Sequence, residues 1–133
     1  MDGYQCGAHT KYSMKVHLIF VVKYRKKILT DQIAEAVKLS LFGSTGELGC
    51  NIIQMETAVD HIHILLEYCP YLSISQIVKK LKQDSTNVLW SAHSSILRSC
   101  FWKHRVLWSK GYFACSIGQA SQETIEAYIK NQG

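Results

Sequence analysis

The sequence lacks the features that mark membrane proteins, secreted proteins and small zinc domains. No apolar run approaches the ~20 residues that a membrane-spanning helix needs, so we expect no membrane partner. No N-terminal stretch combines a basic start, an apolar centre and a small-residue cleavage site, which argues against secretion. The five cysteines are widely spaced without any C-x-x-C pair, which argues against a zinc knuckle. We therefore expect a cytoplasmic protein with buried, reduced thiols.

Proline is also scarce, since Pro70 is the single one, and no internal repeat, low-complexity stretch or linker is evident. What is present fits one globular domain, because the 133 residues are 47% hydrophobic and only 19% charged. We expect this domain to span residues 1–133, with residues 1–12 as a loose N-terminal arm. The formal net charge of +5 favours an anionic partner, although only weakly.

Three apolar segments rich in β-branched and aromatic residues predict strands over 15–23, 51–58 and 61–68. Only two residues separate the last two segments, so these are expected to form an antiparallel hairpin. Two later stretches, 106–108 and 112–117, are extended in composition.

Capping residues and apolar periodicity predict the helices between these strands. Thr30 and Asp31 begin one helix, whose glycines should make it fray or stop between residues 43 and 49. Ser73 and Gln76 have the spacing of a capping box and begin another.

The remaining apolar segments complete the order of elements. Residues 96–102 are compatible with a shorter helix, and residues 121–132 are helical in composition. The resulting order is βαββαβα, which is typical of the split β-α-β (ferredoxin-like) arrangement. We therefore expect an α+β fold with an antiparallel sheet and its helices on one face.

The segment Asp60-His61-Ile62-His63 carries the most specific chemistry in the chain. Side chains alternate along a strand, so His61 and His63 should share one face while Ile62 points to the other. Two adjacent imidazoles provide half of a metal site. Such a pair alone is more often ordinary surface or core histidine, so a metal site needs a further ligand.

The last helix offers that ligand together with a nucleophile. Tyr128 and Gln132 are four residues apart and therefore share a helix face. The amide oxygen of Gln132 with the two imidazoles gives a mixed nitrogen–oxygen set that suits Mn²⁺ and Mg²⁺ and also accepts Zn²⁺. A phenol is a poor nucleophile at neutral pH, but it can attack a phosphodiester made reactive by a cation. Taken alone, a tyrosine in this position is usually a packing residue.

Four neighbouring residues have simpler explanations. His17 lies in the first predicted strand, where a core or sheet-face role is favoured over a ligand role. Tyr112 lacks a glutamine four residues on and is expected to be structural. Glu56 and Asp60 flank the predicted hairpin, where they could support the metal ligands or merely serve the turn.

Together these segments resemble the single-tyrosine HUH transposases of insertion sequences, the TnpA type of the IS200/IS605 group. The likeness runs from about residue 15 to Gln132, and Ile62 stands at the bulky apolar position of the HUH pattern. The segments that carry it are V-H-L-I-F-V-V-K-Y-R-K-K at 16–27, D-H-I-H-I-L-L-E at 60–67, L-W-S-K-G-Y-F at 107–113, S-I-G at 116–118 and Y-I-K-N-Q at 128–132.

The resemblance implies a role for each matching residue. His61, His63 and Gln132 match the metal ligands, with Mg²⁺ or Mn²⁺ as the cofactor, and Tyr128 matches the nucleophile. Such enzymes cut and rejoin single-stranded DNA at hairpin-flanked ends through a 5′-phosphotyrosine intermediate. They act as homodimers in which the tyrosine helix of one subunit can complete the site of the other. Gln132 is the least secure of these residues, because it lies beside the end of the chain.

Basic residues gather near aromatic ones, a combination typical of proteins that bind single-stranded nucleic acid. Each lysine alone is more simply explained as solvating a surface, so the clusters carry the prediction. Tyr24, Trp102, Trp108 and Tyr112 lie among or beside them. The clusters are Lys23, Arg25, Lys26 and Lys27; Lys79, Lys80 and Lys82; and Lys103, His104, Arg105 and Lys110.

Two other functions remain open at this point. The domain could bind single-stranded DNA or RNA without chemistry, or it could be a relative domesticated by its host to process repeated hairpins. Replacing Tyr128 by phenylalanine separates the enzyme from the binding module, because only the enzyme would lose covalent capture of DNA.

Overall fold

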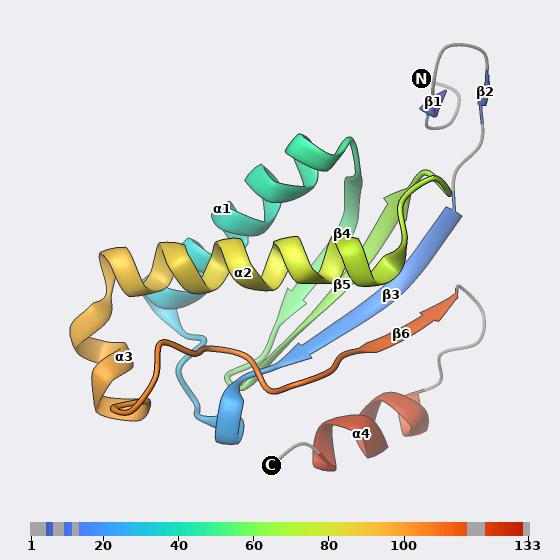
Figure 1. Ribbon diagram of the computed structural model, residues 1–133. Helices are drawn as coiled ribbons and strands as arrows, with labels where there is room; N and C mark the ends of the chain where they lie inside the picture. The colour runs from blue at the N-terminus through green and yellow to red at the C-terminus, as the bar shows by residue number, and fades with distance from the viewer. Residues whose placement is uncertain (1–4, 7–9, 12–13, 117–121, 132–133) are drawn as a thin grey trace.

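The structure is a computed structural model that describes residues 5–6, 10–11, 14–116 and 122–131. Its centre is a four-stranded antiparallel sheet in the order β4-β5-β3-β6 (Figure 1). The strands of this sheet are β3 (Met14–Val21), β4 (Asn51–Thr57), β5 (His61–Tyr68) and β6 (Phe113–Ser116). The helices are η1 (Lys23–Arg25), α1 (Asp31–Leu48), α2 (Ile74–Ala92), α3 (Ser94–Cys100) and α4 (Gln122–Lys130).

The register of the central strands divides their residues between two faces. Phe20 pairs with Ile62 and Leu18 with Ile64, and all four side chains are fully buried. The intervening residues point to the other face, as alternation along a strand requires. There Val21 pairs with His61, and Ile19 pairs with His63.

Helices α1 and α2 lie side by side across the first of these faces and close the core (Figure 1). Ile33, Val37 and Leu41 recur at helical spacing along α1 and are buried, as their periodicity predicts. The two helices are also joined by a hydrogen bond of 2.7 Å from Ser44 Oγ to Asp84 Oδ2.

The predicted ends of these helices are confirmed. The Ser73 side chain accepts a hydrogen bond from the Gln76 backbone, and the Gln76 side chain accepts one from the Ser73 backbone. Helix α1 continues past Gly43 and ends at Leu48, within the expected interval. Gly49 follows with φ of 73°, a left-handed conformation that glycine adopts without a Cβ penalty.

The segment after α3 is tied to α2 by side-chain hydrogen bonds. Trp90 Nε1 donates to the carbonyl of Val106 over 2.9 Å, and Trp108 Nε1 donates to Ser85 Oγ over 2.9 Å. The Lys82 amine donates to the carbonyls of Ser109 and Gly111. These contacts fix the chain just before β6 enters the sheet.

The α+β class and the antiparallel sheet are as predicted, but α4 departs from the expectation that all helices share one face. The Tyr128 ring in α4 lies 5.6 Å from the ring of Phe113. Phe113 pairs with Ile19, whose side chain lies on the face opposite the core helices. Because α1 and α2 already cover the core face, α4 packs on the other one.

Within the arm expected over residues 1–12, the structure describes two short paired strands, β1 (Gln5–Cys6) and β2 (Thr10–Lys11). One smaller expectation needs correction. Cys50, Cys100 and Cys115 are free thiols, but Cys69 forms a disulfide bond, so the expectation of reduced cysteines is wrong for Cys69.

No helix in the described part of the chain combines the length and the apolar character that a membrane-spanning segment requires.

Candidate active site

Strand β5 presents its two histidines side by side on the face turned away from α1 and α2. Ile62, Ile64 and Leu66 are fully buried, whereas His61 and His63 are only partly buried. The prediction that the two imidazoles share a face is therefore confirmed. Both rings are reachable from the surface, as metal ligands must be.

His61 is held by a short chain of polar contacts. Asp60 Oδ1 lies 2.9 Å from His61 Nδ1, and Asp60 Oδ2 lies 3.4 Å from Arg25 Nε. Burial alone would raise the pKa of Asp60, but the hydrogen bonds and charges of His61 and Arg25 lower it overall. An ionised carboxylate only accepts hydrogen bonds, so His61 donates through Nδ1, and Nε2 is the ring nitrogen left to face a ligand.

His63 has a different set of neighbours. Its Nε2 lies 2.9 Å from Nδ1 of His17 on the adjacent strand, and the two rings are 5.0 Å apart. Burial, with smaller effects from His17 and His61, lowers the pKa of His63 against the opposing effect of Glu56. The imidazole is thus kept neutral, which is the form that binds a metal. Binding through Nε2 would require His17 to move aside.

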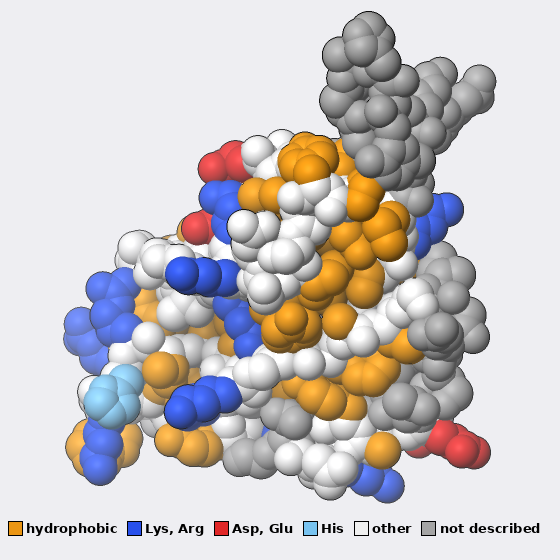
Figure 2. Space-filling view, turned by 45° about the vertical axis from the view of Figure 1, so that its right-hand side comes forward, with side chains coloured by type: hydrophobic (Ala, Val, Ile, Leu, Met, Phe, Trp, Pro, Cys, Tyr) orange, Lys and Arg blue, Asp and Glu red, His pale blue; other side chains and the backbone are white. Residues whose placement is uncertain are grey.

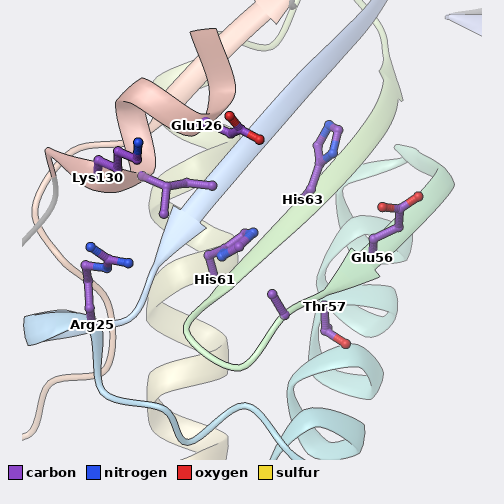
Figure 3. Close-up of a pocket in the computed structure, with 9 residues that line it drawn as sticks. Arg25, Glu56, Thr57, His61, His63, Glu126 and Lys130 are labelled. Carbon is purple, nitrogen blue, oxygen red and sulfur yellow. The ribbon is translucent and has the colours of Figure 1, made fainter. Parts of the chain in front are cut away.

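A pocket of about 400 Å³ opens over the two histidines. Figure 3 shows Glu126 and Lys130 on α4 above it, Arg25 at one end, and Glu56 and Thr57 of β4 on the far side. The lining thus comes from η1, β4, β5 and α4, with both signs of charge represented. We call this the histidine pocket, lined by Arg25, Glu56, Thr57, Ala58, His61, His63, Glu126, Ile129 and Lys130.

Tyr128 lies on the same face of the sheet, but it does not line the histidine pocket. Residues 126, 129 and 130 of α4 do, and the 100° rotation per residue places Tyr128 on nearly the opposite side of that helix. Its ring packs on Phe113, two strands from β5 and hence roughly 10 Å from it. The tyrosine is half-buried, and burial raises its pKa.

The third predicted ligand, Gln132, lies outside the described residues. Within the part of the chain that the structure describes, no group of three or more histidine, cysteine, aspartate or glutamate side chains could hold a metal ion. The two imidazoles nevertheless fit a divalent cation, because one is oriented by a carboxylate and the other is kept neutral.

Comparison with known proteins matches nearly the whole chain to one family. The family model described as "Transposase IS200 like" covers residues 10–132. The chain belongs to the IS200-like transposase family. It is therefore a DNA-processing enzyme of DNA transposition and recombination.

Individual relatives agree with this family. The ISDra2 transposase TnpA of Deinococcus radiodurans is 31% identical over 121 residues, which cover 91% of this chain and 85% of that protein. The transposase for insertion sequence element IS200 of Salmonella typhimurium is 30% identical over 125 residues, which cover 94% and 80%.

Solved structures show the same fold. A crystal structure of a candidate transposase from Deinococcus radiodurans has a TM-score of 0.86 at 30% identity and covers 96% of this chain and 97% of its own. A REP-associated tyrosine transposase bound to a REP hairpin has a TM-score of 0.57 at 11% identity, covering 96% and 70%. The second likeness shows the fold alone.

The basic clusters of this transposase differ in how exposed their side chains are and in whether these side chains contact other groups of the chain. Lys26, Lys27, Lys79 and Lys110 are exposed, and Figure 2 shows most of the basic side chains in the left half of its view. Lys80 instead contacts Glu47 and Asp84 at 3.2 and 3.0 Å. The half-buried Lys82 amine bonds two backbone carbonyls.

The third cluster and the start of the first lie against aromatic rings. Lys103 sits 5.0 Å from the centre of the Trp102 ring, and Arg105 sits 5.8 Å from that of Trp90. Lys23 sits 5.4 Å from the Tyr24 ring. Trp102 and Tyr24 are exposed, so Lys103 and Lys23 lie next to rings on which bases could stack, whereas the Trp90 ring beside Arg105 is buried.

Sequence reasoning missed three parts of this site. His17 was expected on a sheet face but not against His63, because the strand register that joins them is not visible in either segment. Glu126 and Lys130 share a helix face at four-residue spacing. That spacing signals a common face, but not which pocket the face adjoins.

Proposed function

We propose that this transposase cleaves and rejoins single-stranded DNA at hairpin-flanked ends through a 5′-phosphotyrosine intermediate on Tyr128. The observation that carries the proposal is the imidazole pair of His61 and His63 at a pocket that is also lined by Arg25 and Lys130, together with Glu56 and Glu126. A scissile phosphate in this pocket would meet two cationic side chains and a ligand pair for a divalent ion.

The proposed reaction exchanges one phosphodiester bond for another. The Tyr128 oxygen, after losing its proton, attacks the phosphorus, and the bond to the 3′ oxygen breaks, so that the leaving strand ends in a 3′-hydroxyl. A second 3′-hydroxyl can later reverse this exchange and rejoin strands without an external energy source. Arg25 and Lys130 stabilise the charge that develops on the phosphate oxygens.

The proposed cofactor is Mg²⁺ or Mn²⁺, held by His61, His63 and Gln132. A divalent ion in this place supplies Lewis-acid polarisation of the phosphate. Asp60 contributes by fixing the His61 tautomer, which keeps Nε2 available.

We further propose a homodimer with composite active sites. In one chain, Tyr128 packs on Phe113 at the β6 side of the sheet, away from the histidine pocket. A tyrosine helix donated by a second copy could approach the histidines with its Tyr128 side toward the pocket. The proposed location is the cytoplasm, where a DNA substrate would be accessible.

The test is incubation with single-stranded hairpin DNA and Mg²⁺ or Mn²⁺, followed by denaturing electrophoresis. We expect a denaturant-resistant protein–DNA adduct that Tyr128→Phe abolishes while leaving DNA binding intact. Tyr112→Phe is the matched control and should retain the adduct. DNA binding without any adduct in the wild-type protein would instead indicate a non-catalytic binding module.

A further inference from the structure

A second pocket, of about 210 Å³, is also lined by residues of η1. We call it the aromatic pocket. It lies between η1 and the segment after α3, and its lining includes Lys23, Tyr24, Phe101, Trp102, Lys103 and His104. Phe101 is 4% exposed and belongs to the core, so it anchors this wall of the pocket.

The rings at the mouth of this pocket are unusually exposed. Trp102 is 76% exposed and Tyr24 is 61% exposed, and the Tyr24 ring lies 6.4 Å from that of Phe101. By contrast, Trp90 and Trp108 are buried, with their indole N–H groups hydrogen-bonded. Packing in this chain thus explains two tryptophans and leaves the third available to a ligand.

The backbone that presents Tyr24 is held in a conformation that non-glycine residues rarely adopt. Tyr24 has φ of 60° and Arg25 has φ of 51°, both in the left-handed region, which costs roughly 1 kcal/mol or more per residue. Hydrogen bonds from Lys23 N to Leu107 O and from Arg25 N to Val22 O hold the turn. Such strained conformations cluster at binding and active sites.

The charges around the aromatic pocket select an anion. Lys23 and Lys103 lie 5.4 and 5.0 Å from the Tyr24 and Trp102 rings, and His104 is nearby. The described lining contains no aspartate or glutamate. A flat apolar surface edged by cations suits a ligand with a flat ring and a phosphate, which is a nucleotide.

The two pockets are joined by consecutive residues. Tyr24 lines the aromatic pocket and Arg25 lines the histidine pocket, so η1 contributes to both. One DNA strand crossing η1 could therefore place a phosphate against Arg25 and a neighbouring base against Tyr24.

We propose that the aromatic pocket binds an unpaired base of the single DNA strand, next to the phosphate in the histidine pocket. This inference rests on the proposed function, because it takes that strand as its ligand. Tyr24 and Trp102 stack on the base, while Lys23 and Lys103 contact the adjoining phosphates. Base stacking on aromatics tolerates any sequence, so the pocket sets the path of the strand and does not read a particular base.

The test uses the full-length protein and two probes, a 12-nucleotide oligothymidylate and a 12-unit abasic deoxyribose-phosphate strand. Trp102→Ala should weaken oligothymidylate binding by about 5- to 150-fold, the range for loss of one base–aromatic stack. It should leave binding of the abasic strand unchanged. Trp102→Phe should restore most of the affinity, and Phe42→Ala, which removes an exposed ring on α1, should behave as wild type.

The contrary results are equally specific. Wild-type affinity of both Trp102→Ala and Tyr24→Ala for oligothymidylate would overturn the proposal, as would an equal loss for both probes. Thermal unfolding identifies any misfolded variant. If an alanine variant misfolds, the oligothymidylate affinities of Trp102→Phe, which keeps an aromatic ring, and Lys103→Ala, which loses a charge, are compared in its place. The adduct assay tests a different claim. If the wild-type protein forms no adduct but its binding of oligothymidylate depends on Trp102, the catalytic proposal is refuted while the proposal for the aromatic pocket is supported.

Discussion

The two faces of strand β5 carry different kinds of residue, although they belong to the same eight positions of the chain. On one face Ile62, Ile64 and Leu66 are fully buried beneath α1 and α2. On the other, His61 and His63 remain partly exposed beneath a short helix and a pocket. The alternation of side chains along β5 thus places the core residues on one face and the candidate site residues on the other.

This separation means that changes on one face should not mimic changes on the other. Removal of apolar atoms from the core face costs folding free energy, because a cavity remains. Removal of an imidazole from the open face costs ligand atoms and little packing. The following variants test how complete the separation is.

The largest effect is expected for His61→Ala. Loss of this proposed metal ligand should remove several kcal/mol of transition-state stabilisation, so DNA cleavage should fall by about 1,000-fold or more. Thermal stability of the metal-free protein should fall less than for Ile64→Ala, since the His61 side chain is partly exposed, although its contact to Asp60 is lost. The measurements are single-turnover cleavage and calorimetry, and a large drop in stability would contradict the separation.

The next effect concerns the opposite face. Ile64→Ala should lower the free energy of unfolding by about 2–5 kcal/mol, because Ile64 is fully buried in the main core. Denaturant titration measures this. Under conditions where the variant remains folded, its cleavage rate per folded molecule should stay within a few-fold of wild type. A loss of cleavage as large as that of His61→Ala would show that the two faces do not have separate roles.

Asp60→Asn tests the residue that orients the open face. Loss of the carboxylate partner of His61 should weaken metal binding by about 10- to 100-fold. The pKa of Asp60 is lowered in the folded protein, so its stabilising effect is present above the ordinary aspartate pKa and lost as pH falls through the lower folded value. Asp84→Asn, which removes a carboxylate between α1 and α2, should leave metal affinity unchanged.

The smallest effect is expected for Lys82→Met on α2. The amine donates hydrogen bonds to the carbonyls of Ser109 and Gly111. Its loss should lower the free energy of unfolding by about 1–2 kcal/mol without changing metal affinity. Burial lowers the pKa of Lys82. The unfolded chain therefore binds more protons just below the ordinary lysine pKa, and wild-type stability should rise with pH across that window relative to the variant. An opposite slope in denaturant titrations would contradict this.

Local sequence patterns predicted those parts of the molecule that depend on local physics. The histidine pair follows from period-two alternation, and the start of α2 follows from the Ser73–Gln76 capping box. The face on which α4 packs could not be predicted, because it depends on which surface α1 and α2 leave open.

Contacts between distant segments also could not be predicted from the sequence. The 2.9 Å contact between His17 and His63 depends on the register of β3 against β5, which neither segment specifies alone. The packing of Tyr128 on Phe113 depends on the placement of α4. The metal role of Gln132 stays a prediction, because this residue lies outside the described part of the chain.

The most direct test of the account is to map the covalent link itself. Wild-type protein would be incubated with single-stranded hairpin DNA, with Mg²⁺ or with chelator, then digested with protease and nuclease and analysed by mass spectrometry. The account predicts a nucleotide attached to the peptide containing Tyr128, formed with metal and absent with chelator. A nucleotide on another residue, or an adduct whose yield does not depend on metal, would contradict it.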